Sequence, residues 1–421
     1  MPTPPFARAA RATRSVEEHR AAVAELLAPL PVERVPLGRA RGRVLAEALV
    51  AGIALPPFDN SAMDGYAVRA ADVAGATDGD PRELPVTADI PAGRTDVPPL
   101  EPGTAHRIMT GAPLPAGADT VVQVEHTDGG LDRVRVLRAP TAGTSVRRAG
   151  EDVVAGQVVL PAGTVLGAPQ IGVAAAVGAA ALPVRRRPTV LVLSTGSELV
   201  APGTPLQPGQ IYESNGPMLA AAVEDAGGVA DLLRFVPDDV AHLHRVLDDR
   251  LAAGTVDLVL TSGGISAGAY EVVKEALAGR GVEFVKVAMQ PGGPQGVGRV
   301  GGVGVVALPG NPVSSHVSFE VFVRPPLRAA LGYRHPERPR VTATLAAPLT
   351  STAGRRQFRR GVVDAVAGPA CRREGLTVRE VGGPPSHLLG ALARADCLFV
   401  VPEEVTELPA GAPVEVWLLE G

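Results

Sequence analysis

The clearest hydrophobic pattern lies between residues 189 and 329, where short apolar runs alternate with amphipathic segments. Apolar runs of this length predict strands buried on both faces, and the segments between them predict crossover helices, as in a parallel sheet. The predicted strands are 189–194, 229–236, 256–261, 283–287 and 304–308, and the predicted helices are 217–226, 240–252, 271–278 and 312–324. The pattern indicates a doubly wound α/β domain.

Shorter apolar runs on both sides of this region predict smaller β units. Runs at 84–87, 106–109, 120–124 and 133–137, and again at 340–345, 376–381, 397–401 and 413–419, are separated by Gly, Pro and Asp clusters. Near the N-terminus, Ser15 and Glu18 form a capping box that predicts a helix.

We therefore expect a multidomain α/β plus β chain. The expected units are an N-terminal, helix-containing extended domain (1–54 with 141–187), an inserted small β-domain (55–140), a central doubly wound α/β domain with a parallel or mixed sheet (188–329) and a C-terminal β-barrel domain (330–421).

Composition excludes several classes of protein. A net charge of −4 over 421 residues gives no long-range basic field, so we expect no nucleic-acid or membrane partner. Cys371 and Cys397 are far apart and form no CxxC pair, which argues against disulfides and zinc and favours a reducing compartment. The N-terminus has no apolar signal region, and the longest apolar run, 171–184, is short and interrupted by glycine. We expect a cytoplasmic protein.

Three of the predicted parallel strands end in turns of small residues. Carboxyl ends of parallel strands share one edge of a sheet, where ligands bind in doubly wound folds. Glycine lets backbone N–H groups approach an anion, and the nearby hydroxyl groups add donors, so a phosphate-bearing ligand suits this edge. The candidate ligand-binding residues are Thr195, Gly196, Ser262, Gly263, Gly264, Pro309, Gly310 and Asn311. None of these three strand-end turns carries G-x-G-x-x-G or a Walker lysine motif, which argues against a nicotinamide dehydrogenase or a P-loop NTPase.

Carboxylates accompany these turns. Glu198, Asp238 and Glu271 could hold an oxygen-liganded cation such as Mg²⁺ beside phosphates, although Glu271 could equally serve the dipole of its own helix. Asp257 stands at the opposite end of its strand and is expected to be structural. The histidines have no metal-ligand spacing, and no Ser-His-Asp arrangement can be argued.

A polar segment within the inserted β-domain allows three interpretations. Residues 56–67 read "PPFDNSAMDGYA", with two aspartates, an asparagine and a serine in a chain otherwise dominated by alanine, valine and proline. Such residues stabilise turns by bonding nearby amides, group oxygens around a cation, or form one wall of a polar active site. The segment alone does not decide among these.

Several segments together resemble one known family. "PPFDNSAMDGYAVRAAD", "RIMTGAPLPAGAD", "LSTGSEL", "GQIYESNG", "TSGGISAG" and "ALPGNPVSSHVSFEVFVRP" occur in this order. The chain resembles the molybdopterin molybdenumtransferase family, whose animal homologue is the C-terminal part of gephyrin. The resemblance extends over nearly the whole chain beyond the first dozen residues.

The resemblance implies a reaction and a shared site. Members take adenylylated molybdopterin and molybdate, cleave the pyrophosphate bond in the presence of Mg²⁺, and release AMP and molybdenum cofactor. It implies a homodimer in which the "FDNSAMDGYA" segment of one subunit faces the pterin-binding domain of the other. Possible contacts with the adenylylating enzyme and with acceptor molybdoenzymes follow as well. The positions that match the family's functional residues are Asp59, Thr110, Glu198, Asp238, Lys286, Arg360 and Ser386, with Lys274 beside the ligand.

The chain differs from the family pattern near the expected metal and oxyanion positions. Ala269 and Glu271 stand where the family has an acidic residue and then Asp, and residues 290–294 read "QPGGP" where the family has "KPGKP". The loss of two lysines predicts a weaker molybdate site or one that relies on arginine, with Arg299 or Arg360 as candidates.

Two other functions fit the same segments. Related pterin-binding domains perform molybdopterin adenylylation with ATP, and a gephyrin-type dimer can act as a non-catalytic scaffold for partner peptides. The retained Asp59, Glu198 and Asp238 favour catalysis over the scaffold, and the two β-domains argue against adenylylation.

Overall fold

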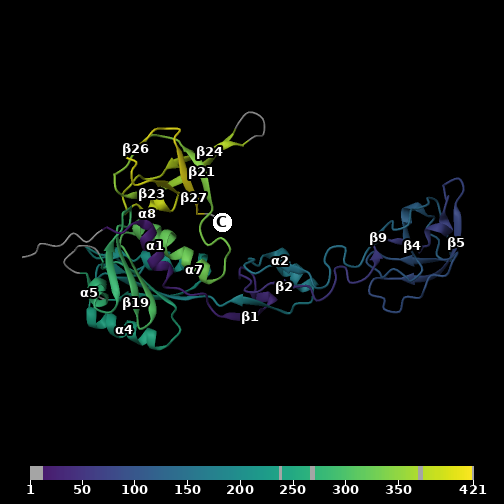
Figure 1. The fold of residues 1–421 in the computed structure, drawn as a ribbon, viewed down its shortest axis with the longest axis horizontal. Coiled ribbons are helices and arrows are strands. Elements are labelled where there is room, and N and C mark those ends of the chain that lie inside the picture. Colours follow the sequence, from purple (N-terminus) through teal and green to yellow (C-terminus); the bar gives the residue numbers. More distant parts are fainter. Residues whose placement is uncertain (1–12, 237–238, 266–270, 368–372, 420–421) are drawn as a thin grey trace, which may run out of the picture.

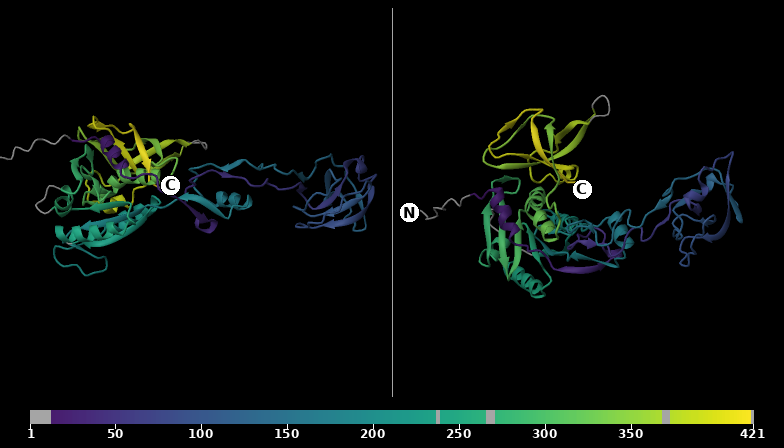
Figure 2. Two further views of the ribbon diagram at one scale, coloured as in Figure 1. Left: turned by 60° about the horizontal axis from the view of Figure 1, so that its bottom comes forward. Right: turned by 45° about the vertical axis from the view of Figure 1, so that its right-hand side comes forward.

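The computed structural model describes residues 13–236, 239–265, 271–367 and 373–419. Figure 1 shows an elongated molecule, with an α/β unit and a β-barrel packed together at one end and a separate β unit at the other. The two further views in Figure 2 show the same separation. Asp238 and Ala269 lie outside the described residues.

The α/β unit is built on a six-stranded sheet in the order β15-β12-β16-β20-β19-β17. Its first four strands are parallel and the last two are antiparallel to their neighbours. The strands are β12 (Thr189–Thr195), β15 (Val229–Val236), β16 (Leu258–Ser262), β17 (Val282–Lys286), β19 (Pro294–Val300) and β20 (Val303–Leu308). This is the mixed α/β sheet that the apolar runs predict.

Helices cover both faces of this sheet because its strands are apolar on both sides. On one face, Val190 and Val192 pack in a core with residues of α1, α3, α6 and α7, and on the other Leu191 and Leu193 pack with residues of α4 and α5. The helices are α1 (Val16–Ala24), α3 (Asn215–Asp225), α4 (Val240–Ala252), α5 (Val272–Ala278), α6 (Pro312–Ser318) and α7 (Arg324–Ala330), with a π-helical turn at Phe319–Val323. The result is a three-layer unit.

An extended region joins the α/β unit to the distal β unit. It consists of the antiparallel pairs β1 (Val32–Pro36) with β11 (Ala181–Arg185) and β2 (Leu49–Val50) with β10 (Val158–Leu160), and of the helix α2 (Ala168–Ala176). The chain passes through this region twice, so both connections to the distal unit are anchored here.

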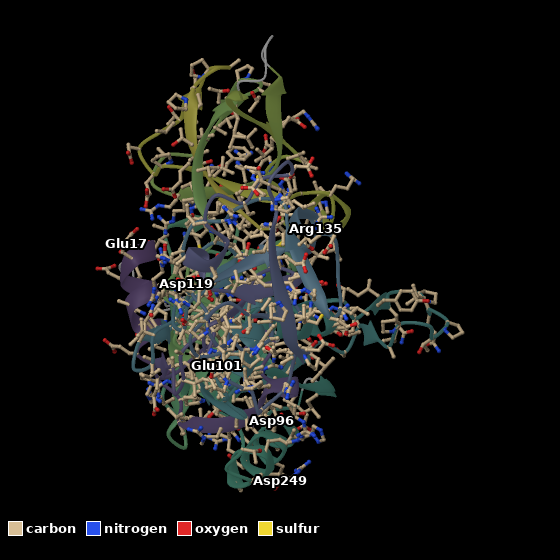
Figure 3. All side chains as sticks on the ribbon, turned by 90° about the vertical axis from the view of Figure 1, so that its right-hand side faces the viewer. Glu17, Asp96, Glu101, Asp119, Arg135 and Asp249 are labelled. Atoms are coloured by element: carbon tan, nitrogen blue, oxygen red, sulfur yellow. The ribbon has the colours of Figure 1, made fainter. Side chains whose placement is uncertain are left out.

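The distal unit is a curled half-barrel of five strands in the order β7-β4-β6-β5-β8. Its strands are β4 (Gly65–Val68), β5 (Arg82–Ile90), β6 (Ala105–Ile108), β7 (Thr120–Gln123) and β8 (Arg133–Val136), and the short pair β3 (Asn60–Ser61) and β9 (Val146–Arg147) stands beside them. Figure 3 views this unit end-on and shows acidic and basic side chains, among them Asp96, Glu101 and Arg135, on its outside.

The C-terminal unit is a closed barrel, because β23 pairs with β25 as well as with β24. The barrel strands are β21 (Arg340–Leu345), β23 (Arg356–Ala367), β24 (Arg373–Glu380), β25 (Cys397–Val401) and β27 (Pro413–Leu418). The short strand β18 (Met289–Gln290) leaves the α/β unit and adds to β23. That pairing fixes the barrel beside the α/β unit.

Several elements differ from the expectations. The strand β19 was not predicted, because "PQGVGRV" has glycine where a strand usually has a side chain; a Cβ at Gly298 would lie 2.0 Å from the carbonyl oxygen of Gly281. The arginine-rich start of β23 and the helix α2 were also missed. The predicted helix that starts at Ser15 is confirmed, but its buried residues pack in the core of the α/β unit rather than with the extended region.

No helix within the described ranges is long and apolar enough to cross a membrane.

We predict that Ser15→Ala loosens α1. The Ser15 hydroxyl accepts a hydrogen bond from the Glu18 amide at 3.1 Å, and the Glu18 carboxylate accepts one from the Ser15 amide at 2.7 Å. Loss of an N-cap side chain costs about 1 kcal/mol, so amides of residues 16–24 should exchange with solvent about fivefold faster. Ser15→Asp, which keeps a capping oxygen, should exchange like the native chain; equal exchange in all three proteins would contradict the prediction.

Candidate functional site

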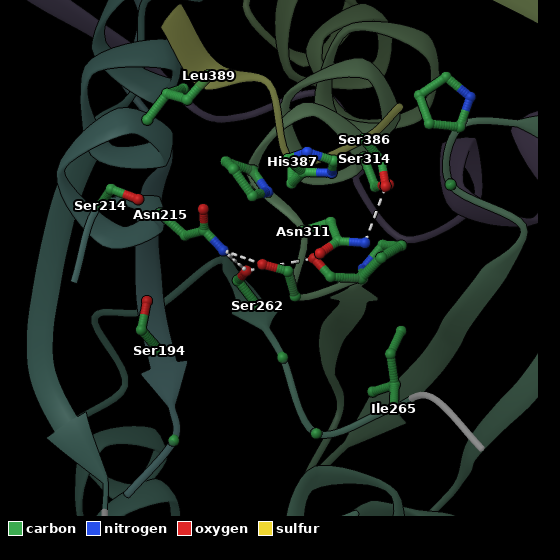
Figure 4. A pocket seen from close by; sticks show the side chains of 18 of the residues that line it. Ser194, Ser214, Asn215, Ser262, Ile265, Asn311, Ser314, Ser386, His387 and Leu389 are labelled. Carbon is green, nitrogen blue, oxygen red and sulfur yellow. Dashed lines mark hydrogen bonds between the residues drawn. The ribbon is translucent and has the colours of Figure 1, made fainter. Parts of the chain in front are cut away.

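The three glycine-containing turns lie together in one cleft of about 1030 Å³. The first turn follows β12, the second follows β16 and the third follows β20, so all three stand at the carboxyl edge of the parallel sheet. Residues 384–387 and Leu389, which come from the C-terminal unit, and the segment 290–294 close the cleft from the side of the barrel. Figure 4 shows the cleft between these segments.

Glycine is required where the turns approach each other. Gly263 has φ +94° and a Cβ there would lie 2.9 Å from the carbonyl oxygen of Thr195. A Cβ at Gly310 would lie 3.3 Å from Cα of Gly263. Side chains at these positions would push the strand ends apart. At this point the Gly263 amide also donates to the carbonyl oxygen of Leu308 at 3.2 Å, so the second and third turns are joined through their backbones.

Polar side chains tie the turns together. The Asn215 amide donates to the Ser262 hydroxyl at 2.9 Å and to the Gly310 carbonyl oxygen at 2.6 Å. The Ser262 and Ser315 hydroxyls lie 2.9 Å apart, and Ser315 also donates to the carbonyl oxygen of Pro309. Asn215 is the first residue of α3, so this network links α3 to the second and third turns (Figure 4).

Buried polar atoms at the cleft wall have no partner in the described structure. They are the hydroxyls of Ser194 and Thr195 and Oδ1 of Asn215. Buried polar groups without hydrogen bonds are costly, and they are usually satisfied by water or a ligand. These three atoms are therefore available to a polar ligand in the cleft.

Ser386 lies at the rim of the cleft that belongs to the barrel. Its hydroxyl accepts a hydrogen bond from the Asn311 amide at 2.8 Å. Arg360 does not line the cleft; its buried guanidinium donates to the carbonyl oxygens of Gly383 and Pro385. Burial also lowers the pKa of Arg360. In this structure Arg360 supports the loop that carries Ser386.

The charge of the cleft is acidic. Glu198, Glu213 and Glu271 line it, and Glu213 is buried, where its carboxylate accepts from the Gly216 amide at 2.6 Å. Among the described lining residues there is no lysine or arginine. An anionic ligand in this cleft therefore needs a cation or a basic group from elsewhere.

The basic residues expected beside the ligand lie outside the lining. Lys286 is exposed at the end of β17, and Lys274 lies within α5. Arg299 donates to the carbonyl oxygens of Glu25 at 2.6 Å and Gly302 at 3.0 Å, away from the cleft. The segment that replaces the family's two lysines, 290–294, does contribute Gln290, Pro291, Gly292 and Pro294 to the lining.

Asp59 directly precedes β3 and Thr110 follows β6, and the unit that contains these strands lies far from the α/β unit (Figures 1 and 2). The Asp59 carboxylate accepts from the Ala149 amide at 2.8 Å and from the Arg148 guanidinium at 2.6 Å. These bonds, the backbone one first, lower the pKa of Asp59. Thr110 donates to Asp64 from its amide at 2.6 Å and from its hydroxyl at 2.8 Å. The turn interpretation of this segment thus has direct support within one chain.

Asp257 has the structural role expected of it. Its carboxylate pairs with Arg186 at 2.6 Å and accepts from the Thr189 amide at 2.7 Å, at the opposite end of the sheet from the cleft.

Sequence reasoning did not single out Asn215, Glu213, Ser315 or His387, although all but Ser315 line the cleft and Ser315 holds its floor. The segment "YESNG" contains the first two, and an acidic residue followed by Asn at a helix start was the available signal. Ser315 and His387 carry no local signal, since only the packing of α6 and of the barrel loop brings them here.

These features define a class: an α/β protein with a ligand-sized cleft at the carboxyl edge of a parallel sheet, against an adjoining β-barrel. Family models match three parts of the chain. The MoeA N-terminal region (domains I and II) matches residues 14–178, a probable molybdopterin binding domain matches 191–329, and the MoeA C-terminal region (domain IV) matches 342–419.

Known relatives agree over the full length. Molybdopterin molybdenumtransferase 2 of Mycobacterium tuberculosis is 56% identical over 411 residues, which cover 96% of this chain and 99% of that protein. The molybdopterin molybdenumtransferase of Haemophilus influenzae is 34% identical, with 92% and 94% covered. A crystal structure of the molybdopterin biosynthesis moeA protein from Pyrococcus horikoshii superposes with a TM-score of 0.78 at 30% identity, covering 97% of this chain and 100% of that one. The chain belongs to the molybdopterin molybdenumtransferase family, a family of transferases.

We predict that Gly264→Ala disturbs the cleft more than a matched substitution elsewhere. Gly264 has φ +64° and a Cβ there would lie 3.0 Å from the Val273 side chain; Gly254 has φ +68° with no atom within 4 Å. Both variants bear the backbone strain, and Gly264→Ala adds crowding worth about 1 kcal/mol. Its Tm should fall about 3 °C further than that of Gly254→Ala. Equal Tm values for the two variants would contradict the prediction, because they would show that the turn at Gly264 accommodates the added Cβ without cost.

Proposed function

We propose that this protein inserts molybdenum into adenylylated molybdopterin and releases AMP and molybdenum cofactor. The observation that carries the proposal is the cradle of three strand-end turns that meet at Gly263, in a chain similar over its full length to enzymes named for this transfer. Backbone donors at Gly196 and Gly310 would bind the phosphates, and the unpartnered hydroxyl of Thr195 would donate to the same ligand; the Gly263 amide donates to the carbonyl oxygen of Leu308 and holds the turns together.

Mg²⁺ fits the carboxylates of the cleft. Within the described ranges, no three His, Cys, Asp or Glu side chains are placed to share a metal ion. Mg²⁺ commonly takes only one or two protein carboxylates and completes its shell with water and substrate phosphate oxygens. Glu198 and Glu271, with Asp238 as the remaining candidate, would hold it. The ion would neutralise the pyrophosphate charge that these acidic residues otherwise repel.

Release of AMP also needs positive charge, and the described lining of one chain's cleft contains no lysine or arginine. We propose a homodimer in which the distal unit of one copy reaches the cleft of the other. The distal unit would then bring Asp59 with its ion-pair partner Arg148, and Thr110 with Asp64, to the cleft of the other copy. Molybdate is the second substrate, and the cytoplasm, where the adenylylated substrate would be supplied, is the proposed compartment.

In this arrangement the roles of the side chains differ. Arg360 and Ser386 would hold the barrel loop over the bound adenylate side of the substrate. Lys274 and Lys286, which lie outside the lining, would act only if the substrate extends past Glu271 toward α5 and β17.

The test of the activity is direct. Purified protein given adenylylated molybdopterin, Mg²⁺ and molybdate should release AMP and form a cofactor that activates an apo-molybdoenzyme. Omission of molybdate should leave the apo-molybdoenzyme inactive. AMP formation from ATP and free molybdopterin, or no turnover with either substrate, would replace the proposal by the adenylylating or scaffold function.

A mixing experiment tests the shared site. Asp59→Ala and Glu198→Gln should each abolish AMP release, because each removes one carboxylate from every site of a homodimer. When the two variants are mixed and allowed to exchange subunits, half of the dimers carry one intact site, so activity should recover to about a quarter of the native value. Glu198→Gln mixed with Glu271→Gln serves as the control and should stay inactive, because both substitutions affect the same half-site. No recovery in the first mixture would contradict the shared site.

A further inference from the structure

A second cleft, of about 810 Å³, lies at α7 and the linker that leads from it to β21. We call it the arginine cleft. It is lined by Arg324, Arg328, Arg334, His335, Pro336, Glu337, Arg338, Pro339 and Arg340. It shares no lining residue with the candidate active site. The proposed transfer reaction uses none of these side chains.

The acidic groups at the arginine cleft are already engaged. Glu320, at the base, accepts from Arg338 at 2.9 and 3.1 Å and lies 3.8 Å from Arg324. Glu337 is shared between Arg20 and Arg340. These two carboxylates therefore offset at most part of the positive charge that surrounds the cleft.

Two arginines have no carboxylate within 4 Å in the described structure. The Arg328 guanidinium lies over the ring of Tyr333, 3.7 Å from its centroid. Arg334 donates to the carbonyl oxygen of Ala162 at 3.2 Å. The partners of both guanidinium groups are neutral. Their positive charges are therefore not compensated by these contacts, and an anion can neutralise them.

Arg324 is the most informative side chain. It is only 3% exposed, yet its Nε and Nη1 have no hydrogen-bond partner, and Nε of Arg328 is likewise buried without one. Burial lowers the pKa of Arg324 to about 10, and desolvation also lowers the pKa of Arg328. A buried guanidinium with empty donors is costly unless a counter-ion satisfies it.

We propose that the arginine cleft binds a tetrahedral, doubly charged oxyanion, namely a phosphate group, through Arg324, Arg328 and Arg334. Planar guanidinium groups bind phosphate oxygens in pairs, and three of them around one cleft select this geometry and charge. The volume exceeds that of a single ion, so the phosphate can be free or part of a larger molecule.

The experiment titrates inorganic phosphate into the full-length protein by calorimetry at constant ionic strength. We expect saturable binding to the native chain, and at least tenfold weaker binding to Arg328→Gln/Arg334→Gln. These two side chains are partly or fully exposed, so the double variant should fold, and circular dichroism and AMP release verify this. Arg39→Gln/Arg41→Gln, which changes two exposed arginines outside the cleft, is the charge-matched control and should bind like the native chain.

A second arm uses glycerol 3-phosphate as a simple ester. Tenfold tighter binding of the ester than of inorganic phosphate, lost in the same double variant, assigns the cleft to the phosphate of a larger molecule; weaker binding of the ester assigns it to the free oxyanion. Equal phosphate affinity in the native chain and the double variant overturns the proposal. So does the absence of phosphate binding together with a changed oligomeric state in the double variant, which would show that the arginines meet acidic side chains of another molecule.

Discussion

The close contact of three strand ends is the constraint on which the rest of the structure depends. Gly263 brings the β16 turn against the Thr195 carbonyl, and Gly310 brings the β20 turn against Gly263. Hydrogen bonds from Asn215 and Ser315 lock this arrangement. The turns at this sheet edge are therefore held at fixed positions, so little reorganisation is needed when a ligand binds.

The candidate active site is electrostatically incomplete within one chain. Its described lining contains three glutamates and no lysine or arginine, although its geometry suits phosphate. A cation between the carboxylates and the phosphates resolves this conflict, and so does a basic group from a second copy. The distal unit lies far from the α/β unit of its own chain (Figure 1), and the proposed homodimer would use this separation to bring the ion pair of Asp59 and Arg148 to the cleft of a second copy.

Arginine has structural duties at several points of this molecule. Arg360 holds the loop that carries Ser386, Arg186 holds Asp257 at the start of the sheet, and Arg338 is paired with buried Glu320. The guanidinium groups of these arginines donate to carbonyl oxygens or pair with carboxylates. Arg324 in the arginine cleft differs in degree, because two of its buried nitrogens, Nε and Nη1, have no hydrogen-bond partner, whereas Arg360 lacks a partner at Nε alone. The hydrogen-bond and ion-pair partners of an arginine, and not its residue type, distinguish a structural arginine from one that is available to a ligand.

The amino-acid sequence by itself determined the strands and helices whose signals are local. The strand 229–236 and the helix 240–252 have the predicted limits, and the capping box at Ser15 and Glu18 is present as expected. The three turns could be placed at one edge because parallel strands share direction, and that edge indeed lines one cleft. The family resemblance was equally a property of ordered local segments.

Only the tertiary structure decided which side chains meet across units. The strand β19 depends on glycines that let Gly281 approach, and Ser386 reaches Asn311 because the C-terminal unit packs against the α/β unit. Arg360 and Arg299 look alike in sequence as candidate anion ligands, yet both donate to carbonyl oxygens. Contacts between residues far apart in the chain depend on packing, and no local pattern of hydrophobic and polar positions encodes them.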